Sequence, residues 1–259
     1  MAETIGAIRD KIQAAAIDRL PDLLLEYEQD TRAGVQAALE RGRKRISAYE
    51  QELARIETLK RYEKEYASYA YICGIDEVGR GPLAGPVVAG AVILPKDCDI
   101  LYINDSKKLS EKKREELYDE IMERAVAVAV GYSPPQRIDE INILQATYEA
   151  MREAVAGLKV APDLLLNDAV TIPQLSVRQV PIIKGDAKSI SIGAASIVAK
   201  VTRDRLMVQY DAVFPEYGFA SNKGYGAQAH IDALKKYGPC PIHRKSFITH
   251  FCGQQDYCE

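Results

Sequence analysis

The stretch from Tyr71 to Pro95, YICGIDEVGRGPLAGPVVAGAVILP, holds two apolar segments separated by charged and glycine-rich residues. The first segment leads directly into two adjacent acids, Asp76 and Glu77, and then into Gly79-Arg80-Gly81. Two like charges about 4 Å apart repel each other by about 4 kcal/mol at an effective dielectric constant of about 20. The fold or the function must therefore compensate this pair of carboxylates.

From this stretch onward, short β-rich segments alternate with helical patterns. After YICGI, we expect strands in PVVAGAVIL, AVAVAVGY, PDLLLN and VRQVPIIK. We expect helices in SEKKREELYDEIMERA, with Ser110 as its N-cap, in IDEINILQATYEAMREAVAGL, and in SIGAASIVAKVTRDRLMVQYDAVF. This order of elements predicts a mixed α/β sheet that is covered by helices.

Residues 1–70 differ in composition from the rest of the chain, because they are rich in Glu, Arg, Ala and Leu. The apolar spacing predicts a short helix, a turn at Pro21 and a long helix to about Tyr66. We therefore expect an all-helical N-terminal extension, residues 1–70, and a main domain, residues 71–259. The extension either packs against a partner or the main domain, or stands as a solvated lever. Its 12 Lys/Arg and 13 Asp/Glu give a net charge of −1, which does not indicate an electrostatic clamp on DNA.

The whole chain has 259 residues, 47% of them hydrophobic, and a net charge of −3, as is ordinary for a globular protein. No apolar segment approaches the roughly 18 residues that span a membrane. Charges among the first residues argue against a secretory signal, and five cysteines indicate reduced thiols, so we expect a cytoplasmic protein. One segment, from Ala220 to His250, has five Lys/Arg against one acid, which fits either a phosphate partner or a solvated helix and loop.

Acidic residues follow three of the predicted strands. Asp76 and Glu77 follow YICGI, Asp168 follows the apolar part of PDLLLND, and Asp186 follows VPIIKG. Strand ends meet at one edge of an α/β sheet, and a few carboxylates with water and phosphate are what Mg²⁺ prefers. Two such ions can stabilise the attacking and leaving oxygens of a phosphoryl displacement. A single Asp there can instead form a turn or cap a helix, and spacing alone leaves both interpretations open.

Several motifs together give a resemblance to a known family. GIDEVGRGPLAGPVVAGAVILP, NDSKKLS, LLLNDAV, IIKGDAKSISIGAASIVAKVTRDR and NKGYGAQAHIDALKKYGPCPIHRKSF closely resemble bacterial ribonuclease HII, the type 2 ribonuclease H, in the family's order over about residues 71–250. The resemblance implies the ribonuclease H-like fold, a central mixed sheet flanked by helices. It implies two-metal-ion endonucleolytic cleavage of RNA joined to DNA within a duplex, leaving 3′-hydroxyl and 5′-phosphate ends. The family's metal-binding carboxylates fall on Asp76, Glu77, Asp168 and Asp186, with two Mg²⁺ or Mn²⁺ ions as cofactors.

The same resemblance assigns substrate contacts. Gly79, Arg80 and Gly81 would read the 2′-hydroxyl of the ribonucleotide on the 5′ side of an RNA-DNA junction, since that hydroxyl alone marks RNA. Tyr225 would pack on the deoxyribose that follows, which permits cleavage at a single ribonucleotide in DNA. Ser106 and Lys107 would contact phosphates near the cut. Without the resemblance, Gly-Arg-Gly is commonly a turn and Tyr225 a half-buried packing residue.

Other residues have less certain roles. Lys200 and Arg203 fit either phosphate contacts or salt bridges to the neighbours of their helix, and we expect His230 to pack on a helix. Where the family commonly has Asp-Gly, this chain has Asp168-Ala169, a change that could alter the backbone and the metal geometry. The tail also contains four possible zinc ligands: Cys240, His243, His250 and Cys252. We reject a zinc site there, because these residues are irregularly spaced and the family motif GPCPIHRKSF already accounts for Cys240 and His243.

The sequence thus predicts a nuclease for ribonucleotide and RNA primer removal, with RNA/DNA hybrids and ribonucleotide-containing duplex DNA as its partners. We expect no membrane association, a monomer, and contact with a replication or repair protein through the extension. Two alternatives are a non-catalytic hybrid-binding protein and an enzyme like ribonuclease HIII that acts on long hybrids only. The preferred metal and recruitment by a sliding clamp stay open.

Overall fold

The structure is a computed structural model that describes residues 3–251. The chain forms two compact units, residues 1–58 and 59–259. The boundary predicted from composition lies at residue 70 instead. Within residues 3–251, no helix has the length and apolar character that crossing a membrane requires.

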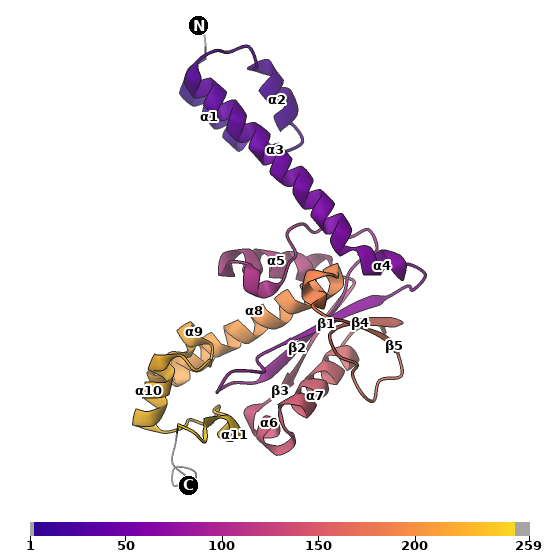
Figure 1. Ribbon diagram of the computed structural model, residues 1–259, viewed down its shortest axis with the longest axis vertical. Coiled ribbons are helices and arrows are strands. Elements are labelled where there is room, and N and C mark those ends of the chain that lie inside the picture. The colour runs from indigo at the N-terminus through magenta and orange to yellow at the C-terminus, as the bar shows by residue number, and fades with distance from the viewer. Residues whose placement is uncertain (1–2, 252–259) are drawn as a thin grey trace. The chain divides into compact units, whose positions relative to one another are not determined.

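The first unit is helical, which confirms the helical N-terminal region. It contains α1 (Ile5–Ala14), α2 (Leu20–Glu26) and most of α3 (Ala33–Leu59) (Figure 1). We predicted that Pro21 separates two helices, but it lies in the first turn of α2, where its missing N–H group has no helical partner to lose. The buried core of this unit comes from all three helices: Ile8, Ile12, Leu20, Leu24, Val35, Ala38 and Leu39.

The long helix is shorter than predicted. It ends at Leu59 rather than near Tyr66, and a separate short helix, α4 (Arg61–Glu65), follows it. In α4, the Glu63 Oε1 atom accepts hydrogen bonds from the Ser189 hydroxyl at 2.5 Å and from the Ser191 N–H at 3.0 Å. A carboxylate at a helix N-terminus is favourable, because the first N–H groups lack partners and carry partial positive charge. Glu63 therefore fixes the first turn of the helix that starts at Ile190.

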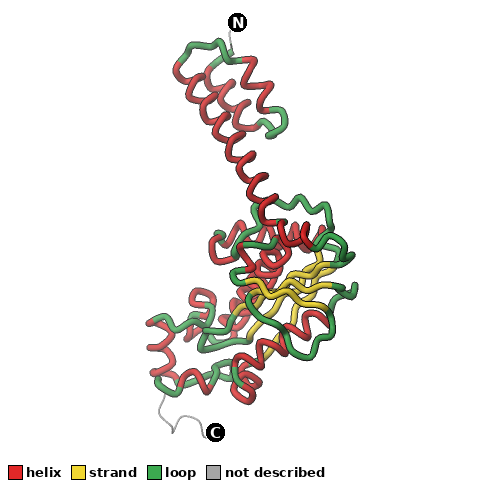
Figure 2. Tube along the Cα trace, turned by 45° about the vertical axis from the view of Figure 1, so that its right-hand side comes forward, coloured by secondary structure: helices red, strands yellow, loops and turns green. Residues whose placement is uncertain are grey.

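The second unit is built on one five-stranded sheet of order β3-β2-β1-β4-β5, drawn in yellow in Figure 2. The β1–β2 and β2–β3 pairs are antiparallel, and the β1–β4 and β4–β5 pairs are parallel, so the predicted mixed sheet is confirmed. The strands are β1 (Ile72–Val78), β2 (Val87–Ile93), β3 (Ala127–Ser133), β4 (Leu164–Asp168) and β5 (Arg178–Ile182).

Helices connect these strands and follow the last of them along the chain. They are α5 (Glu111–Arg124), α6 (Pro135–Ile141), α7 (Ile143–Ala156), α8 (Ile190–Val213), α9 (Phe219–Asn222), α10 (Gln228–Tyr237) and α11 (Lys245–Ile248), with short 3₁₀ turns η1 (Ser106–Lys108), η2 (Gly185–Ala187) and η3 (Pro215–Tyr217). The Ser110 hydroxyl caps α5 by accepting from the Lys113 N–H at 3.2 Å, as predicted. The helix predicted over IDEINILQATYEAMREAVAGL is two helices, because Asn142 has φ 70° and its side chain caps α7.

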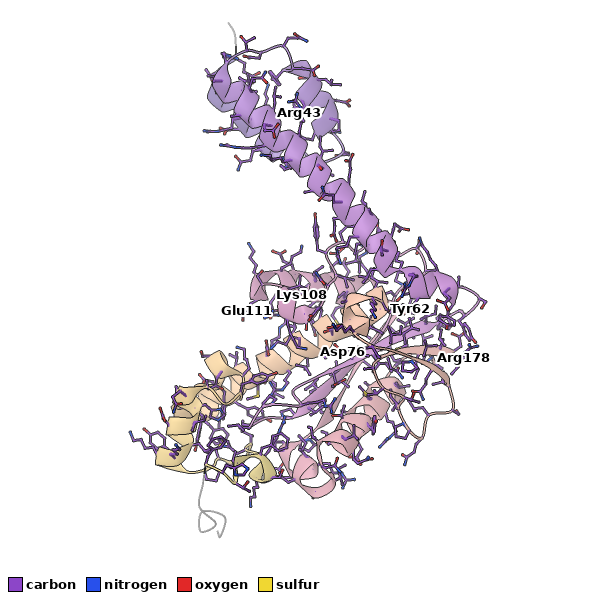
Figure 3. All side chains as sticks on the ribbon, viewed as in Figure 1. Arg43, Tyr62, Asp76, Lys108, Glu111 and Arg178 are labelled. Atoms are coloured by element: carbon purple, nitrogen blue, oxygen red, sulfur yellow. The ribbon has the colours of Figure 1, made fainter. Side chains whose placement is uncertain are left out.

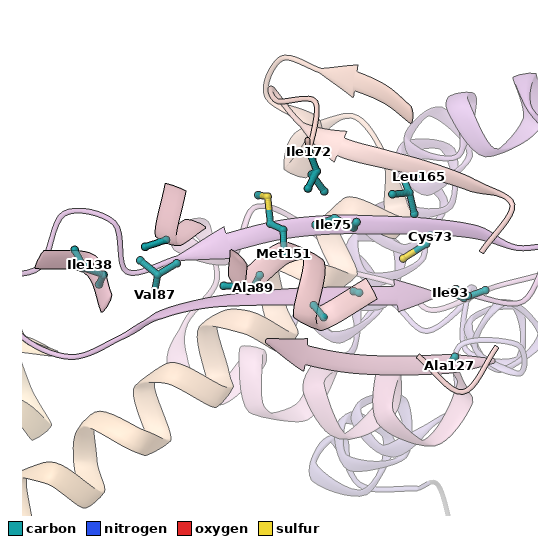
Figure 4. Packing of buried hydrophobic residues seen from close by; sticks show 14 residues of the cluster. Cys73, Ile75, Val87, Ala89, Ile93, Ala127, Ile138, Met151, Leu165 and Ile172 are labelled. Carbon is teal, nitrogen blue, oxygen red and sulfur yellow. The ribbon is translucent and has the colours of Figure 1, made fainter. Parts of the chain in front are cut away.

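The two faces of the sheet carry different partners. The face that includes Cys73, Ile75 and Ala89 packs on α7 in the main apolar cluster (Figure 4). The other face lies against α8, where two glycines allow backbone contact. A Cβ on Gly74 would lie 2.0 Å from the Ser191 carbonyl carbon, and one on Gly90 would lie 2.5 Å from the Ala195 oxygen. Because side chains alternate along a strand, Asp76 points toward the α8 face.

Candidate active site

Three of the predicted acids lie in two neighbouring strands of the sheet, β1 and β4. Asp76 and Glu77 belong to β1 itself, so the expectation that the strand ends at Ile75 is wrong, and Asp168 is the last residue of β4. Ile75 pairs with Asn167, which brings the next residues of both strands side by side. The fourth acid, Asp186, lies in η2, which contacts both β4 and α8. Figure 3 labels Asp76, near α8.

Burial and mutual repulsion disfavour the charged forms of Asp76 and Glu77. The pKa of Asp76 is raised well above its usual value by burial and by the negative charges of Glu77 and Asp168, although a hydrogen bond from Ser196 lowers it. Burial also raises the pKa of Glu77, while Arg80, whose Nη1 lies 3.4 Å from Glu77 Oε1, opposes that shift. One exposed arginine is thus the cation paired with this part of the cluster.

Asp186 joins the cluster through Asp168. Burial raises the pKa of Asp186, followed by the charges of Asp105 and Asp168, and Lys107 lowers it. Asp168 therefore lies within electrostatic reach of each of the other three predicted acids. Asp105 is an acid of this region that we did not predict. It stands in NDSKKLS, where its side chain accepts from the Lys107 N–H at 3.0 Å and looks from sequence like a turn former.

The acids fit hard divalent cations by their chemistry. All four offer carboxylate oxygens, and a bound cation would offset the burial and the mutual repulsion that raise the pKa values of three of them. Within the described part of the chain, no group of three or more His, Cys, Asp and Glu side chains is arranged to hold one metal ion. Mg²⁺ commonly takes one or two protein carboxylates and completes its shell with water and substrate phosphate. Asp76 and Asp168, side by side on neighbouring strands, are a pair of carboxylates that suits this mode of binding.

The loop that follows β1 is held by two buried arginines. Arg203, on α8, donates from Nε to the Pro86 carbonyl at 2.9 Å, from Nη2 to Ala84 at 3.0 Å and from Nη1 to Lys223 at 2.8 Å. Gly79 has φ 90°, and a Cβ there would lie 2.3 Å from Arg203 Nε. Arg203 is therefore a structural residue with backbone partners, which corrects both of its predicted roles.

Arg244 holds the same loop from the other side. It is fully buried and donates to the carbonyls of Gly79 at 2.5 Å, of Arg80 at 2.9 Å, and of Gly85 at 2.9 and 2.8 Å. Burial lowers the pKa of this guanidinium to about 9, so it stays charged near neutral pH. The two arginines fix the backbone of the Gly-Arg-Gly loop and leave the Arg80 side chain exposed.

Tyr225 lies against this loop. Its side chain is 42% exposed, and a Cβ on Gly81 would lie 3.9 Å from Tyr225 Cε1. The Gly224 carbonyl accepts from the Leu83 N–H at 2.8 Å, which joins the segment of Tyr225 to the loop. The structure therefore brings the predicted junction-reading tyrosine next to the predicted 2′-hydroxyl-reading backbone.

Ser106 and Lys107 occupy different environments within η1. Ser106 is buried, and its hydroxyl lies 2.9 Å from that of Ser196, the residue that bonds to Asp76. Lys107 is exposed, and its positive charge lowers the pKa of Asp186. A phosphate contact by Ser106 stays a prediction. The hydrogen bond between Ser106 and Ser196 joins η1 to α8 at the residue that also bonds to Asp76.

Two further predictions concern basic and tail residues. Lys200 pairs with Asp204 at 2.8 Å, a salt bridge within α8 itself rather than to a neighbouring element as predicted. His230 lies fully buried on α10, where its ring meets that of His243. Of the tail residues considered for zinc, Cys252 lies outside the described residues.

Comparisons with known proteins identify the family that this chain resembles. The family model of ribonuclease HII matches residues 73–250, and the model of the ribonuclease HII N-terminal domain matches residues 4–67. A ribonuclease HII from Lachnoclostridium phytofermentans is 69% identical over 223 residues, covering 86% of this chain and 88% of the relative.

Two solved archaeal structures are similar to about two thirds of this chain. The ribonuclease H2 of Pyrococcus horikoshii OT3 has a TM-score of 0.58 and 29% identity, covering 68% of this chain and 93% of that chain. The ribonuclease HII of Archaeoglobus fulgidus, solved in a complex with PCNA, has a TM-score of 0.57 and 29% identity, covering 69% of this chain and 94% of that chain.

Proposed function

This chain belongs to the ribonuclease HII family and is a ribonuclease H, and from that premise we propose where and how it cuts. Its family acts on RNA/DNA hybrids and depends on divalent metal ions. The proposed reaction is hydrolysis on the 5′ side of the ribonucleotide at an RNA-DNA junction, single embedded ribonucleotides included, leaving 3′-hydroxyl and 5′-phosphate ends. The observation that carries the proposal is the cluster around Asp168, which adjoins the Gly79-Arg80-Gly81 loop.

We propose that Asp76, Glu77, Asp168 and Asp186 hold two Mg²⁺ or Mn²⁺ ions. When bound, such ions activate water and stabilise the leaving oxygen of a phosphodiester. The chain's own residues set up this site, because the rigid β1–β4 pair fixes Asp76 and Asp168 while Glu63 and Ser189 fix the segment that follows Asp186. Arg80 and Lys107 supply positive charge at the edge of the cluster, where scissile and flanking phosphates would lie.

Substrate selection is proposed to come from the loop after β1 and from Tyr225. The clamped backbone at Gly79, Arg80 and Gly81 can meet a 2′-hydroxyl with fixed donors and acceptors. Tyr225 can then pack its ring on the next sugar, where a ribose would crowd it and a deoxyribose would fit. This division explains how one ribonucleotide within DNA could be recognised.

The test is cleavage of a DNA duplex that carries one ribonucleotide, in Mg²⁺ or Mn²⁺. We expect one cut on the 5′ side of the ribonucleotide, abolished by chelator and by Asp76→Asn. Asp97→Asn, an exposed acid away from the cluster, is the matched control and should leave the rate unchanged. Equal cutting by the Asp76→Asn protein would contradict the metal assignment, and hybrid binding without any cutting by the unmodified chain would favour the non-catalytic alternative.

The role of Tyr225 has its own test. Tyr225→Ala should reduce cleavage at a single ribonucleotide more than cleavage of a long hybrid. Tyr237→Ala removes an exposed tyrosine of α10 and should not change the ratio. An unchanged ratio in Tyr225→Ala would refute junction reading, and activity of the unmodified chain on long hybrids alone would favour the HIII-like alternative.

We further propose that the protein acts in the cytoplasm as a monomer and removes misincorporated ribonucleotides and RNA primers. The PCNA complex of the Archaeoglobus fulgidus ribonuclease HII supports a replication protein as a partner. Light scattering after gel filtration tests the monomer, and co-purification with a sliding clamp, before and after deletion of residues 1–58, tests whether the extension makes that contact.

A further inference from the structure

A chain of four hydrogen-bonding groups runs through the interior behind Tyr225. The Cys240 thiol and backbone N–H both lie near His243 Nδ1, at 3.1 and 2.9 Å. His243 Nε2 lies 3.0 Å from His230 Nε2, and His230 Nδ1 lies 2.8 Å from the Tyr225 carbonyl oxygen. The chain therefore starts in the loop before His243 and ends on the backbone of the tyrosine that adjoins Gly81.

The chemistry of the two ends fixes every proton between them. A carbonyl oxygen only accepts, so His230 Nδ1 must carry the proton that it donates to Tyr225. A backbone N–H only donates, so His243 Nδ1 must be the unprotonated nitrogen that accepts from Cys240. It follows that His243 carries its proton on Nε2 and donates it to the bare Nε2 of His230. Both ends give the same assignment, and a second proton on either ring would break the chain.

The surroundings keep both rings neutral. His230 is fully buried and His243 is 4% exposed. The rings of Tyr217 and Phe219 pack against both imidazoles. Burial lowers the pKa of His230, and burial together with the neighbouring His230 lowers that of His243 to about 4.

We propose that His230 and His243 are positioning residues for substrate recognition, forming a proton-ordered chain that fixes the Tyr225 backbone and thereby sets its ring against the Gly81 loop. The proposal rests on the proposed junction-reading role of Tyr225. The carbonyl of Tyr225 also accepts from the Ala227 N–H at 2.8 Å, so the histidine supplies the second of its two bonds. Tyr225 N–H donates to the Asn222 carbonyl, so the His230 bond is the one that ties the backbone groups of Tyr225 itself to a side chain of α10.

Two substitutions of the same histidine separate positioning from simple packing. His230→Asn places an N–H group where Nδ1 lies, so it keeps the bond to Tyr225 and loses the one to His243. His230→Gln places an oxygen where Nε2 lies, so it keeps the bond to His243 and loses the one to Tyr225. Each variant loses one buried hydrogen bond. His230→Asn leaves the His243 Nε2–H without a partner, whereas in His230→Gln the Tyr225 carbonyl keeps its bond from Ala227, so His230→Asn should lower the melting temperature at least as much.

We expect His230→Gln to lower the ratio of single-ribonucleotide to long-hybrid cleavage by about tenfold, which is what one hydrogen bond is worth. His230→Asn should keep the ratio within about twofold of the unmodified chain. His250→Gln, an exposed histidine, serves as the control for the substitution itself. Equal ratios in the two His230 variants would overturn the positioning role.

A spectroscopic measurement keeps this inference distinct from the proposed function. Long-range ¹H–¹⁵N correlation spectra at pH 7 should show His230 protonated on Nδ1 and His243 protonated on Nε2. The opposite tautomers, or a charged ring, would overturn the chain whatever the enzyme cuts. If the tautomers are as assigned but Tyr225→Ala leaves the cleavage ratio unchanged, then the role of Tyr225 fails and the positioning of its backbone stands.

Discussion

Replacing Arg244 by Lys tests the clamp on the Gly-Arg-Gly loop. The guanidinium makes four hydrogen bonds to the carbonyls of Gly79, Arg80 and Gly85. Lysine donates from a single nitrogen and cannot reproduce the planar fork, so at least one buried carbonyl loses its partner. An unsatisfied buried group costs about 1–3 kcal/mol, and weaker bonds to the others bring the expected loss to about 2–4 kcal/mol.

The assay combines thermal unfolding with cleavage kinetics. A loss of this size in a chain of this length should lower the melting temperature by roughly 5–15 °C. We also expect kcat/KM on a single-ribonucleotide duplex to fall by about tenfold or more, since a misplaced loop costs transition-state contacts. Arg152→Lys is the matched control, because Arg152 makes one hydrogen bond, 3.4 Å long, to one carbonyl. If Arg244→Lys matched the unmodified chain in both measurements, the clamp would not hold the loop and the reasoning would fail.

Three further outcomes follow from other residues. Ala169 has φ 57°, so Ala169→Gly should raise the free energy of unfolding by about 1 kcal/mol, checked by urea denaturation; a decrease would contradict the strain. The pKa of His243 is lowered from 6.5 to about 4, so the unfolded chain takes up this proton first as the pH falls. The stability that His243 contributes should be complete above pH 6.5 and fall by up to about 3 kcal/mol by pH 4, a loss absent from His243→Gln. Glu63→Ala should cost about 1–2 kcal/mol and Glu63→Gln less, because Gln keeps an accepting oxygen; equal melting temperatures of the two variants would count against the cap.

The sheet could be predicted from the sequence because its strands carry local signals. Each predicted apolar segment forms one of the five strands, and the small residues beside α8 are visible in the chain. The end of β1 was misjudged because charge usually marks a strand end. Asp76 and Glu77 are charged residues that pair within the sheet, opposite Gly90 and Ala89 of β2.

The helix boundaries failed where one residue has an unusual backbone or an unusual position. Asn142 adopts φ 70° and divides a pattern that reads as one helix. Pro21 lies in the first turn of a helix, although a proline within a helical pattern more often ends or kinks one. Both residues stand at the start of a helix, a position that the apolar spacing alone does not mark.

The four acids and the Gly79-Arg80-Gly81 loop of the candidate site were predicted from the sequence. The buried arginines that hold this loop were not. Arg203 and Arg244 donate to backbone carbonyls, so no acidic side chain elsewhere in the sequence indicates where they bind. The partial signal was the spacing of Arg203, which lies four residues from Ala199 and four from Met207, both on the buried face of the same helix. His230 and His243 are similar, since their pairing depends on α10 meeting the loop before α11.

The position of Glu63 limits how this chain can be shortened for study. The family model of the N-terminal domain ends at residue 67, which makes Ala67 an inviting start for an isolated catalytic part. That cut would remove the acceptor of the Ser189 hydroxyl and the Ser191 N–H, and expose the first turn of the helix nearest Asp186. A weak nuclease made in this way would be misread as evidence that the extension grips substrate. A protein that begins at Leu59 keeps the acceptor, and any difference from full length then reports on the first helical unit alone.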